Sequence, residues 1–234
     1  MKAAIITGAS VGIGRETAAL FLAEGYRVFN LSRRPCPLDK VENISCDLAS
    51  KESVEDCIKL LATSLSEAEH IALVHNASQM RKDSVDDCAS DSLQAVLETN
   101  VVAINRLNRG LLPLMQAGSS IIYIGSTLSE KAVAGSFSYV VSKHAQLGMM
   151  RATCQDLMGR SIHTALICPG FTDTEMLRTH IGTDAQVEAG IAGMNSFNRL
   201  VQPLEIADAV TELLALPQVV PGVIHCGQAY AQGQ

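Results

Sequence analysis

The chain opens with a strand-like segment, a glycine-rich turn and a helical pattern in immediate succession. Lys2 to Thr7 is a short apolar run typical of a buried strand, and the apolar spacing from Arg15 to Glu24 is helical. The turn between them reads Gly8-Ala9-Ser10-Val11-Gly12-Ile13-Gly14. This order predicts that the chain begins an α/β fold with a phosphate-sized opening at the first helix N-terminus, where free N–H groups favour negative charge.

The three glycines of this turn suit different tasks. Gly8 can take a tight turn, Gly12 lets the backbone approach a pyrophosphate, and Gly14 lets the helix pack closely on the strand. Their spacing is Gly-x-x-x-Gly-x-Gly, which differs from the Gly-x-Gly-x-x-Gly of the long-chain dinucleotide folds. A purely structural glycine turn is the alternative interpretation.

Strand and helix patterns alternate along the rest of the chain. Short apolar runs typical of strands buried on both faces are Val28 to Leu31, Val41 to Cys46, Ile71 to Asn76, Ser120 to Gly125, Ser161 to Cys168 and Gly222 to Cys226. Helical patterns are Lys51 to Leu65, Asp91 to Met115, Ser138 to Met158 and Pro203 to Leu216. The alternation predicts a doubly wound parallel sheet of about seven strands with helices on both faces. No linker divides residues 1–234, so we expect a single domain.

Composition and charge exclude several classes of protein. The net charge of -6 argues against nucleic acid and anionic membranes as partners, because both require basic patches. The first strand begins at Lys2 and no apolar run approaches the roughly 18 residues of a membrane span, so we expect a cytoplasmic protein. The seven cysteines and six histidines show no metal-ligand spacing, and we expect free thiols and no metal.

Tyr139 and Lys143 lie four residues apart, which is one helical turn, so phenol and ammonium project from the same helix face. A phenol has a pKa of about 10 and needs a nearby cation to exchange protons readily at neutral pH. Lys143 would supply that cation. The alternative is an ordinary helix surface.

With these motifs placed, the chain resembles the short-chain dehydrogenase/reductase family, a Rossmann fold, over nearly its whole length. The segment Thr7 to Gly14 resembles the family's cofactor loop, and Ser126 lies thirteen residues before Tyr139, at the usual spacing of the catalytic serine. The resemblance implies cofactor contacts from Gly8, Ser10, Gly12, Ile13, Gly14, Asp47, Leu48, Asn76, Ala77, Pro169, Gly170, Thr172 and Thr174.

The resemblance also implies a chemistry. A hydride passes between the nicotinamide and a carbonyl or alcohol carbon while Tyr139 exchanges the proton on oxygen. Lys143 would lower the pKa of Tyr139 and hold the nicotinamide ribose, and Ser126 would donate a hydrogen bond to the substrate oxygen. Asn100 would hold a water that relays protons to Lys143; alternatively, it is a helix-distorting or capping side chain.

Cofactor choice is usually set just after the second strand, where NAD enzymes carry an acidic residue. This chain has Ser32-Arg33-Arg34, which offers two guanidinium groups to a 2′-phosphate and no carboxylate to repel it. We therefore expect NADP (NADPH). Exposed solubilising arginines are the alternative.

The chain departs from the family at one motif. Asn-Asn-Ala-Gly is replaced by His75-Asn76-Ala77-Ser78, so Ser78 adds a side chain where a glycine normally lies against the cofactor. His75 is expected to be a hydrogen-bonded core residue, with a catalytic role as the alternative.

The expected function is an NADPH-dependent short-chain reductase of a ketone or aldehyde. Phe171 to Gln202 would form a lid over the substrate, and its apolar residues would favour neutral carbonyl compounds. The segment Pro169 to Met176 is similar to the sepiapterin and benzil reductase branch. The long helices would pair into a homodimer or homotetramer. The alternatives are an NAD-dependent alcohol or hydroxysteroid dehydrogenase and a non-catalytic NADPH-sensing regulator.

Overall fold

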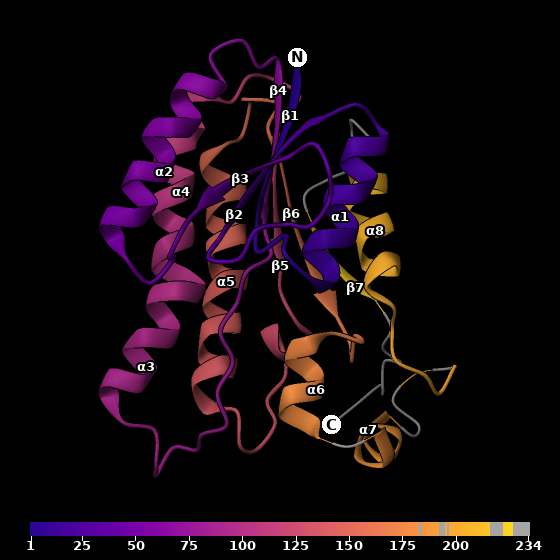
Figure 1. The fold of residues 1–234 in the computed structure, drawn as a ribbon. Coiled ribbons are helices and arrows are strands. Elements are labelled where there is room, and N and C mark those ends of the chain that lie inside the picture. The colour runs from indigo at the N-terminus through magenta and orange to yellow at the C-terminus, as the bar shows by residue number, and fades with distance from the viewer. Residues whose placement is uncertain (183, 192–194, 196, 216–221, 227–234) are drawn as a thin grey trace.

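A computed structural model describes residues 1–182, 184–191, 195, 197–215 and 222–226 (Figure 1). Its centre is one parallel sheet of order β3-β2-β1-β4-β5-β6-β7. The strands are β1 (Lys2–Thr7), β2 (Arg27–Ser32), β3 (Val41–Ser45), β4 (His70–His75), β5 (Ser120–Ile124), β6 (His163–Pro169) and β7 (Gly222–Cys226). The strand order reverses between β1 and β4, which confirms the predicted doubly wound α/β sheet.

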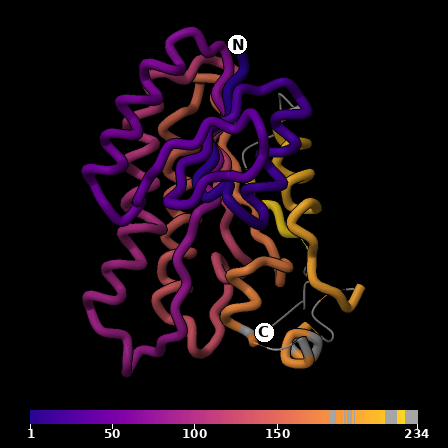
Figure 2. The backbone as a smooth tube through the Cα atoms, viewed as in Figure 1, coloured from indigo at the N-terminus to yellow at the C-terminus, as the bar shows by residue number. Residues whose placement is uncertain are grey.

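Helices cover both faces of the sheet (Figures 1 and 2). The helices α2 (Lys51–Ser64), α4 (Ala103–Leu111) and α5 (Phe137–Asp156) pack on one face, while α1 (Gly12–Ala23) and α8 (Pro203–Ala215) pack on the other. Successive strand residues serve opposite faces, because side chains alternate along a strand. Ile5 belongs to the first core and Ile6 to the second. Burial on both faces explains why these strands read as continuous apolar runs.

The edge strand β3 differs from that description. Only Val41 is buried, and Glu42, Asn43 and Ser45 are exposed. The prediction of a strand buried on both faces is therefore wrong for β3, because the last strand of the sheet has a neighbour on one side only.

The stretch predicted as one helix from Asp91 to Met115 consists of four pieces. They are α3 (Ser90–Leu97), the π-helical turn η1 (Glu98–Val102), α4, and the 3₁₀ turn η2 (Leu112–Leu114). Wide π turns inside helices often occur at functional sites. Asn100 lies in the middle of η1 and is fully buried.

The segment after β6 was expected to be irregular, yet it contains α6 (Glu175–Ile181) and α7 (Asp184–Ile191). A parallel bridge joins Thr172 to Val201 at the base of this segment. Val187, Ile191 and Leu200 form a small core of their own. Among the described residues, no helix is long and apolar enough to cross a membrane.

Candidate active site

The glycine turn makes a narrow cradle between β1 and α1. Gly8 and Gly12 have φ values of 72° and 57°, in the left-handed region that favours glycine. A Cβ atom at Gly14 would lie 2.4 Å from the Gly8 carbonyl oxygen, so no other residue fits there. The turn is therefore as tight as the sequence predicted, and it leaves backbone at the helix N-terminus open to a diphosphate.

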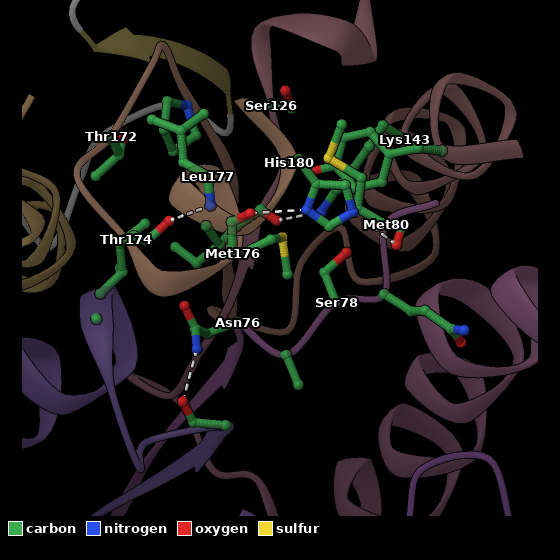
Figure 3. Close-up of a pocket in the computed structure, with 18 of the residues that line it drawn as sticks. Asn76, Ser78, Met80, Ser126, Lys143, Thr172, Thr174, Met176, Leu177 and His180 are labelled. Atoms are coloured by element: carbon green, nitrogen blue, oxygen red, sulfur yellow. Dashed lines mark hydrogen bonds between the residues drawn. The ribbon is translucent and has the colours of Figure 1, made fainter. Parts of the chain in front are cut away.

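Polar side chains tie the carboxyl ends of β1 and β4 together. Thr7 Oγ1 accepts hydrogen bonds from the backbone N–H groups of Asn76 and Ala77, at 2.9 and 3.0 Å. The Asn76 amide donates to the carbonyl oxygens of Thr7 and Gly8, both at 3.0 Å. Asn76 thus fixes the position of the glycine turn, as Figure 3 illustrates for one of these bonds.

The two arginines after β2 have different surroundings. Arg33 is exposed and lines the main cavity. The Arg34 guanidinium binds both carboxylate oxygens of Glu175, at 3.4 and 3.1 Å, and both side chains are 59% exposed. Sequence reasoning found no carboxylate at this place. The fold supplies one from α6, which lies far away in the sequence.

Asp47 and Leu48 follow the edge strand β3. Asp47 Oδ1 accepts from the Ala49 backbone N–H at 3.0 Å. Leu48 is 7% exposed and packs in the core beside Cys46. One carboxylate oxygen of Asp47 is therefore held by its own turn, and the residue remains at the cavity wall.

A cavity of about 1380 Å³ runs along the carboxyl ends of the strands. Seventeen of the nineteen residues named from the sequence line it: Gly8, Ser10, Gly12, Ile13, Arg33, Arg34, Asp47, Leu48, Asn76, Ala77, Ser126, Tyr139, Lys143, Pro169, Gly170, Thr172 and Thr174. Gly14 lies beneath the turn and Asn100 lies behind Lys143. The glycine cradle and the tyrosine–lysine pair therefore share one cavity.

Tyr139 and Lys143 are both buried on α5. The Lys143 Nζ atom lies 5.4 Å from the centroid of the Tyr139 ring. Burial raises the pKa of Tyr139 to about 12, and the nearby hydroxyls of Ser126 and Ser78 lower it only in part. Burial lowers the pKa of Lys143 to about 7. The expected lowering of the Tyr139 pKa by Lys143 is thus absent, because loss of water disfavours both charged forms.

Lys143 is held by two acceptors. Its Nζ atom donates to the Ile124 carbonyl oxygen at 2.9 Å and to Gln146 Oε1 at 3.0 Å. Gln146 Nε2 in turn donates to the Asn100 carbonyl oxygen at 2.8 Å. Sequence analysis expected a water between Asn100 and Lys143 and missed Gln146. The glutamine was recognisable only as a polar residue on the buried face of a helix.

The Asn100 side chain has a different set of partners. Its Oδ1 accepts from the Gln79 N–H at 2.7 Å, and its Nδ2 donates to the Gln79 carbonyl oxygen and to Ser142 Oγ at 2.8 and 2.9 Å. Ser142 then donates to the Tyr139 carbonyl oxygen. The side chain therefore joins the loop after β4 to α5 at the turn that carries Tyr139.

Ser126 begins the short 3₁₀ turn η3 (Thr127–Ser129) after β5. Its Oγ accepts from the Leu128 N–H at 3.1 Å, and Ser129 Oγ accepts from the Ser126 N–H at 3.2 Å. These reciprocal bonds fix the Ser126 side chain beside Tyr139 while leaving its hydroxyl proton available to donate.

His75 is a core residue and is not part of the cavity lining. It is 1% exposed, and its Nε2 donates to Asn108 Oδ1 at 2.7 Å. The Asn108 amide donates to the Tyr123 hydroxyl, which contacts Thr153. Burial lowers the pKa of His75 to about 4, so it is neutral at pH 7. The structure favours the hydrogen-bonded core interpretation.

Ser78, the other departure from the family motif, points into the cavity near Met176 and His180 (Figure 3). Its Oγ atom is buried and has no hydrogen-bond partner of full geometry, although it lies close enough to influence Tyr139. The extra hydroxyl therefore places one more polar group next to the phenol.

The helix α6 lies in the segment expected to form a lid and contributes side chains to the cavity wall. His180 Nδ1 contacts the Met176 carbonyl oxygen at 2.7 Å, and Nε2 contacts the Met80 carbonyl oxygen at 3.2 Å (Figure 3). The expectation of neutral substrates rested on lid residues alone. Arg81, Lys82 and Lys131 line the same cavity from other loops, so the cavity also offers cations to an acidic substrate. Met194, counted among the lid residues, lies outside the described residues.

Comparison with known proteins identifies the family. Residues 2–184 match the family model described as short chain dehydrogenase. The 3-oxoacyl-(acyl-carrier-protein) reductase FabG of Vibrio cholerae is 27% identical over 232 residues, covering 93% of this chain and 91% of that protein. Carbonyl reductase family member 4 of Danio rerio is 25% identical over 234 residues, covering 95% of each. The chain belongs to the short-chain dehydrogenase family and is an oxidoreductase.

Solved structures agree with this assignment. A short chain dehydrogenase family protein from Francisella tularensis superposes with a TM-score of 0.87 at 28% identity, covering 96% of both chains. At lower identity, two further structures share the fold. One is a short chain dehydrogenase from Burkholderia cenocepacia in complex with NADP (TM-score 0.83, 24% identity, 97% of each chain covered). The other is 4-hydroxyisoleucine dehydrogenase complexed with NADH (0.87, 20%, 100% of each).

Proposed function

We propose that this member of the short-chain dehydrogenase family is an NADPH-dependent reductase of ketones or aldehydes, with Tyr139 as the proton donor. The observation that carries the proposal is the buried pair of Tyr139 and Lys143, with the Lys143 Nζ atom 5.4 Å from the phenol ring centroid, in the same cavity as the glycine cradle. With a pKa of about 12, Tyr139 keeps its proton at pH 7, as a donor to a carbonyl oxygen must. The carbonyl reductase and ketoacyl reductase relatives support the direction of the reaction.

The cradle suits a dinucleotide. Gly8, Gly12 and Gly14 leave no room for side chains where the diphosphate would approach α1. Thr174 lies beside Gly12, and Thr172 lines the same cavity. Bound there, NADPH supplies the hydride. The ribose would lie against Tyr139 and Lys143, and the adenine against Asp47 and Leu48. Ser10, Ile13, Ala77, Pro169 and Gly170 would complete the walls.

The chain's own residues handle the proton. The Ser126 hydroxyl donates a hydrogen bond to the substrate oxygen and stabilises the negative charge that develops as the carbonyl is reduced. Tyr139 then gives its proton to that oxygen. The Lys143 ammonium, 5.4 Å from the ring, stabilises the resulting phenolate. Asn100 acts through Gln79, Ser142 and Gln146 by holding α5 in place.

Preference for NADPH rests on Arg33 and Arg34. A guanidinium binds a phosphate through two hydrogen bonds, and one charged hydrogen bond contributes about 1.5 to 3 kcal/mol. Arg34 must leave Glu175 to bind a phosphate, but an ion pair this exposed contributes about 0 to 1 kcal/mol. The phosphate interaction is therefore the stronger one. An NAD-dependent dehydrogenase remains the second candidate, supported by the NADH complex of the structural relative.

Tyr139→Phe tests the assignment. The variant should bind NADPH within a few-fold of wild type, measured by fluorescence titration, because the ring is kept. Reduction of a panel of diketones, aldehydes and ketoacyl thioesters should fall at least about a hundredfold, the usual scale of a lost general acid. Wild-type protein that binds NADPH but reduces nothing in the panel would instead favour the NADPH-sensing regulator.

We also propose that residues 171–202 form a lid on the single domain and that the protein assembles as a homodimer or homotetramer. The α5 helix supports assembly, because Val141, Ala145 and Met149 are only half-buried along one side of it. Sedimentation equilibrium at micromolar concentration should give a mass at least twice that of the chain. A monomer would contradict this proposal.

A further inference from the structure

Gln146 accepts a hydrogen bond from Lys143 but belongs to none of the motifs that the sequence singled out. It lies three residues after Lys143 on α5 and is 1% exposed. Its amide accepts from Lys143 Nζ at 3.0 Å and donates to the Asn100 carbonyl oxygen at 2.8 Å. Both ends of this buried amide are therefore hydrogen-bonded, as buried polar groups usually are, and its position is fixed by these two partners.

The orientation of this amide is fixed by its partners. Lys143 can only donate, and the Asn100 carbonyl can only accept. Gln146 meets both demands with its oxygen toward the amine and its nitrogen toward the carbonyl. The reversed amide would face donor with donor and acceptor with acceptor. The amide therefore links the Lys143 amine to the Asn100 carbonyl oxygen through one hydrogen bond at each end.

The partner carbonyl lies in the π-helical turn η1. In such a turn the backbone hydrogen-bond ladder is locally widened, and Ala103 bonds back to Glu98. The Asn100 carbonyl in the middle of the turn meets Gln146 from the facing helix. The irregular turn and the buried glutamine are two parts of one contact.

We propose that Gln146 is a positioning residue that holds the Lys143 ammonium beside Tyr139. The proposal rests on the proposed role of Tyr139 as proton donor. Lys143 donates to two acceptors, the Ile124 carbonyl and the Gln146 amide. Removing the Gln146 amide therefore leaves the ammonium with one of these two hydrogen bonds.

Two titratable groups among the described residues face Lys143. Tyr139 lies on the same helix, and Cys168 faces it from β6. Burial raises the pKa of Cys168 to about 11, so the thiol is uncharged at pH 7. Neither group is an anion at neutral pH. Hydrogen-bond acceptors, rather than a counter-ion, must therefore favour the charged amine.

Two substitutions separate this role from simple packing. Gln146→Met keeps the length of the side chain and removes its oxygen and nitrogen. Gln146→Ala leaves room for a water that could bond both Lys143 and the Asn100 carbonyl. We expect turnover to fall about tenfold to a hundredfold in the methionine variant, the worth of one charged hydrogen bond. The alanine variant should stay within about threefold of wild type.

Thermal stability should follow the opposite order, because alanine loses more packing than methionine does. A packing role alone predicts that methionine is the milder change in both measurements, and that result would overturn the proposal. Gln155→Met serves as the matched control, since Gln155 is an exposed glutamine on the same helix. It should leave turnover and stability unchanged.

A second readout does not depend on turnover. The ¹³Cε shift of labelled lysine reports the protonation of Lys143 in the free protein, with Lys143→Arg identifying the signal. The titration midpoint should fall by about one pH unit or more in Gln146→Met and stay near wild type in Gln146→Ala. Equal midpoints in wild type and Gln146→Met would overturn the proposal. Failure of wild type to reduce any carbonyl would overturn the proposed function while leaving this measurement intact.

Discussion

The floor of the cavity and the proposed lid are stabilised in different ways. The floor consists of Tyr139 and Lys143, which line the cavity, backed by Asn100, Ser142 and Gln146. All five are buried and hydrogen-bonded to one another or to nearby backbone. The described part of the proposed lid, residues 171–202, has a small apolar core of its own and ion pairs at the surface. Examples are Arg178 with Asp173 and Arg199 with Glu205, in which each arginine is nearly half exposed.

This difference in stabilisation suggests different roles for the two regions, one in catalysis and one in substrate selection. An unpaired buried polar group costs about 1 to 3 kcal/mol, so the floor has one arrangement that satisfies every member. An exposed ion pair contributes about 0 to 1 kcal/mol, so the lid can rearrange at little cost. We therefore expect the floor to determine whether a hydride transfer occurs and the lid to determine which carbonyl compound is admitted.

The largest effect should come from the floor. Asn100→Ala removes the bonds to Gln79 and Ser142, and we expect turnover to fall about a hundredfold because small misplacements of a catalytic group are costly. Asn108→Ala is the matched control. It breaks the His75 and Tyr123 network away from the cavity and should lower the melting temperature without a comparable loss of turnover. Equal losses of turnover would erase the distinction between site and core.

A smaller effect is expected where the cofactor enters. Arg33 lies on the sheet side of the cavity, so Arg33→Ala should reduce the preference for NADPH over NADH about tenfold to a hundredfold, as seen in the two dissociation constants. Arg109→Ala, which removes an exposed arginine from α4, should leave the ratio unchanged. Equal affinity of wild type for both cofactors would refute the NADP assignment.

The smallest effect should appear where floor and lid meet. Glu175→Gln weakens the hold of α6 on Arg34 and frees the guanidinium for a phosphate. We expect NADPH to bind about two- to fivefold more tightly, in line with a weak exposed pair, while NADH affinity stays constant. Tighter binding of both cofactors would show that Glu175 acts on the lid as a whole and not on the 2′-phosphate site.

Much of the fold was predictable because the apolar runs and glycine positions in the sequence match the strands and turns of the sheet. The strand from Lys2 to Thr7 occurs where its apolar run predicted it, and the Gly8–Gly14 turn has the tight geometry that only glycine permits. The family could be recognised for the same reason. Its motifs are short, and each carries its own backbone requirement.

The features missed from the sequence depend on residues that are distant in the chain. The break at Glu98–Val102 was read as continuous helix, since a π turn has no distinct apolar period. The Arg34–Glu175 pair joins positions 141 residues apart. The pKa of Tyr139 was expected to be low because Lys143 is near, but burial raises it, and burial is a property of the packed molecule.

The sequence by itself determined the order of strands and helices, the glycine cradle and the spacing of Tyr139 and Lys143, because each follows from backbone geometry within a few residues. Only the tertiary structure decided how those groups are charged and held. Lys143 bonds to Gln146 on its own helix and to the Ile124 carbonyl of a strand, and Gln146 bonds to the Asn100 carbonyl of the π turn. These contacts form only once the helix, the strand and the turn pack together. Desolvation and hydrogen bonding at this meeting point depend on all three elements at once, which no local pattern encodes.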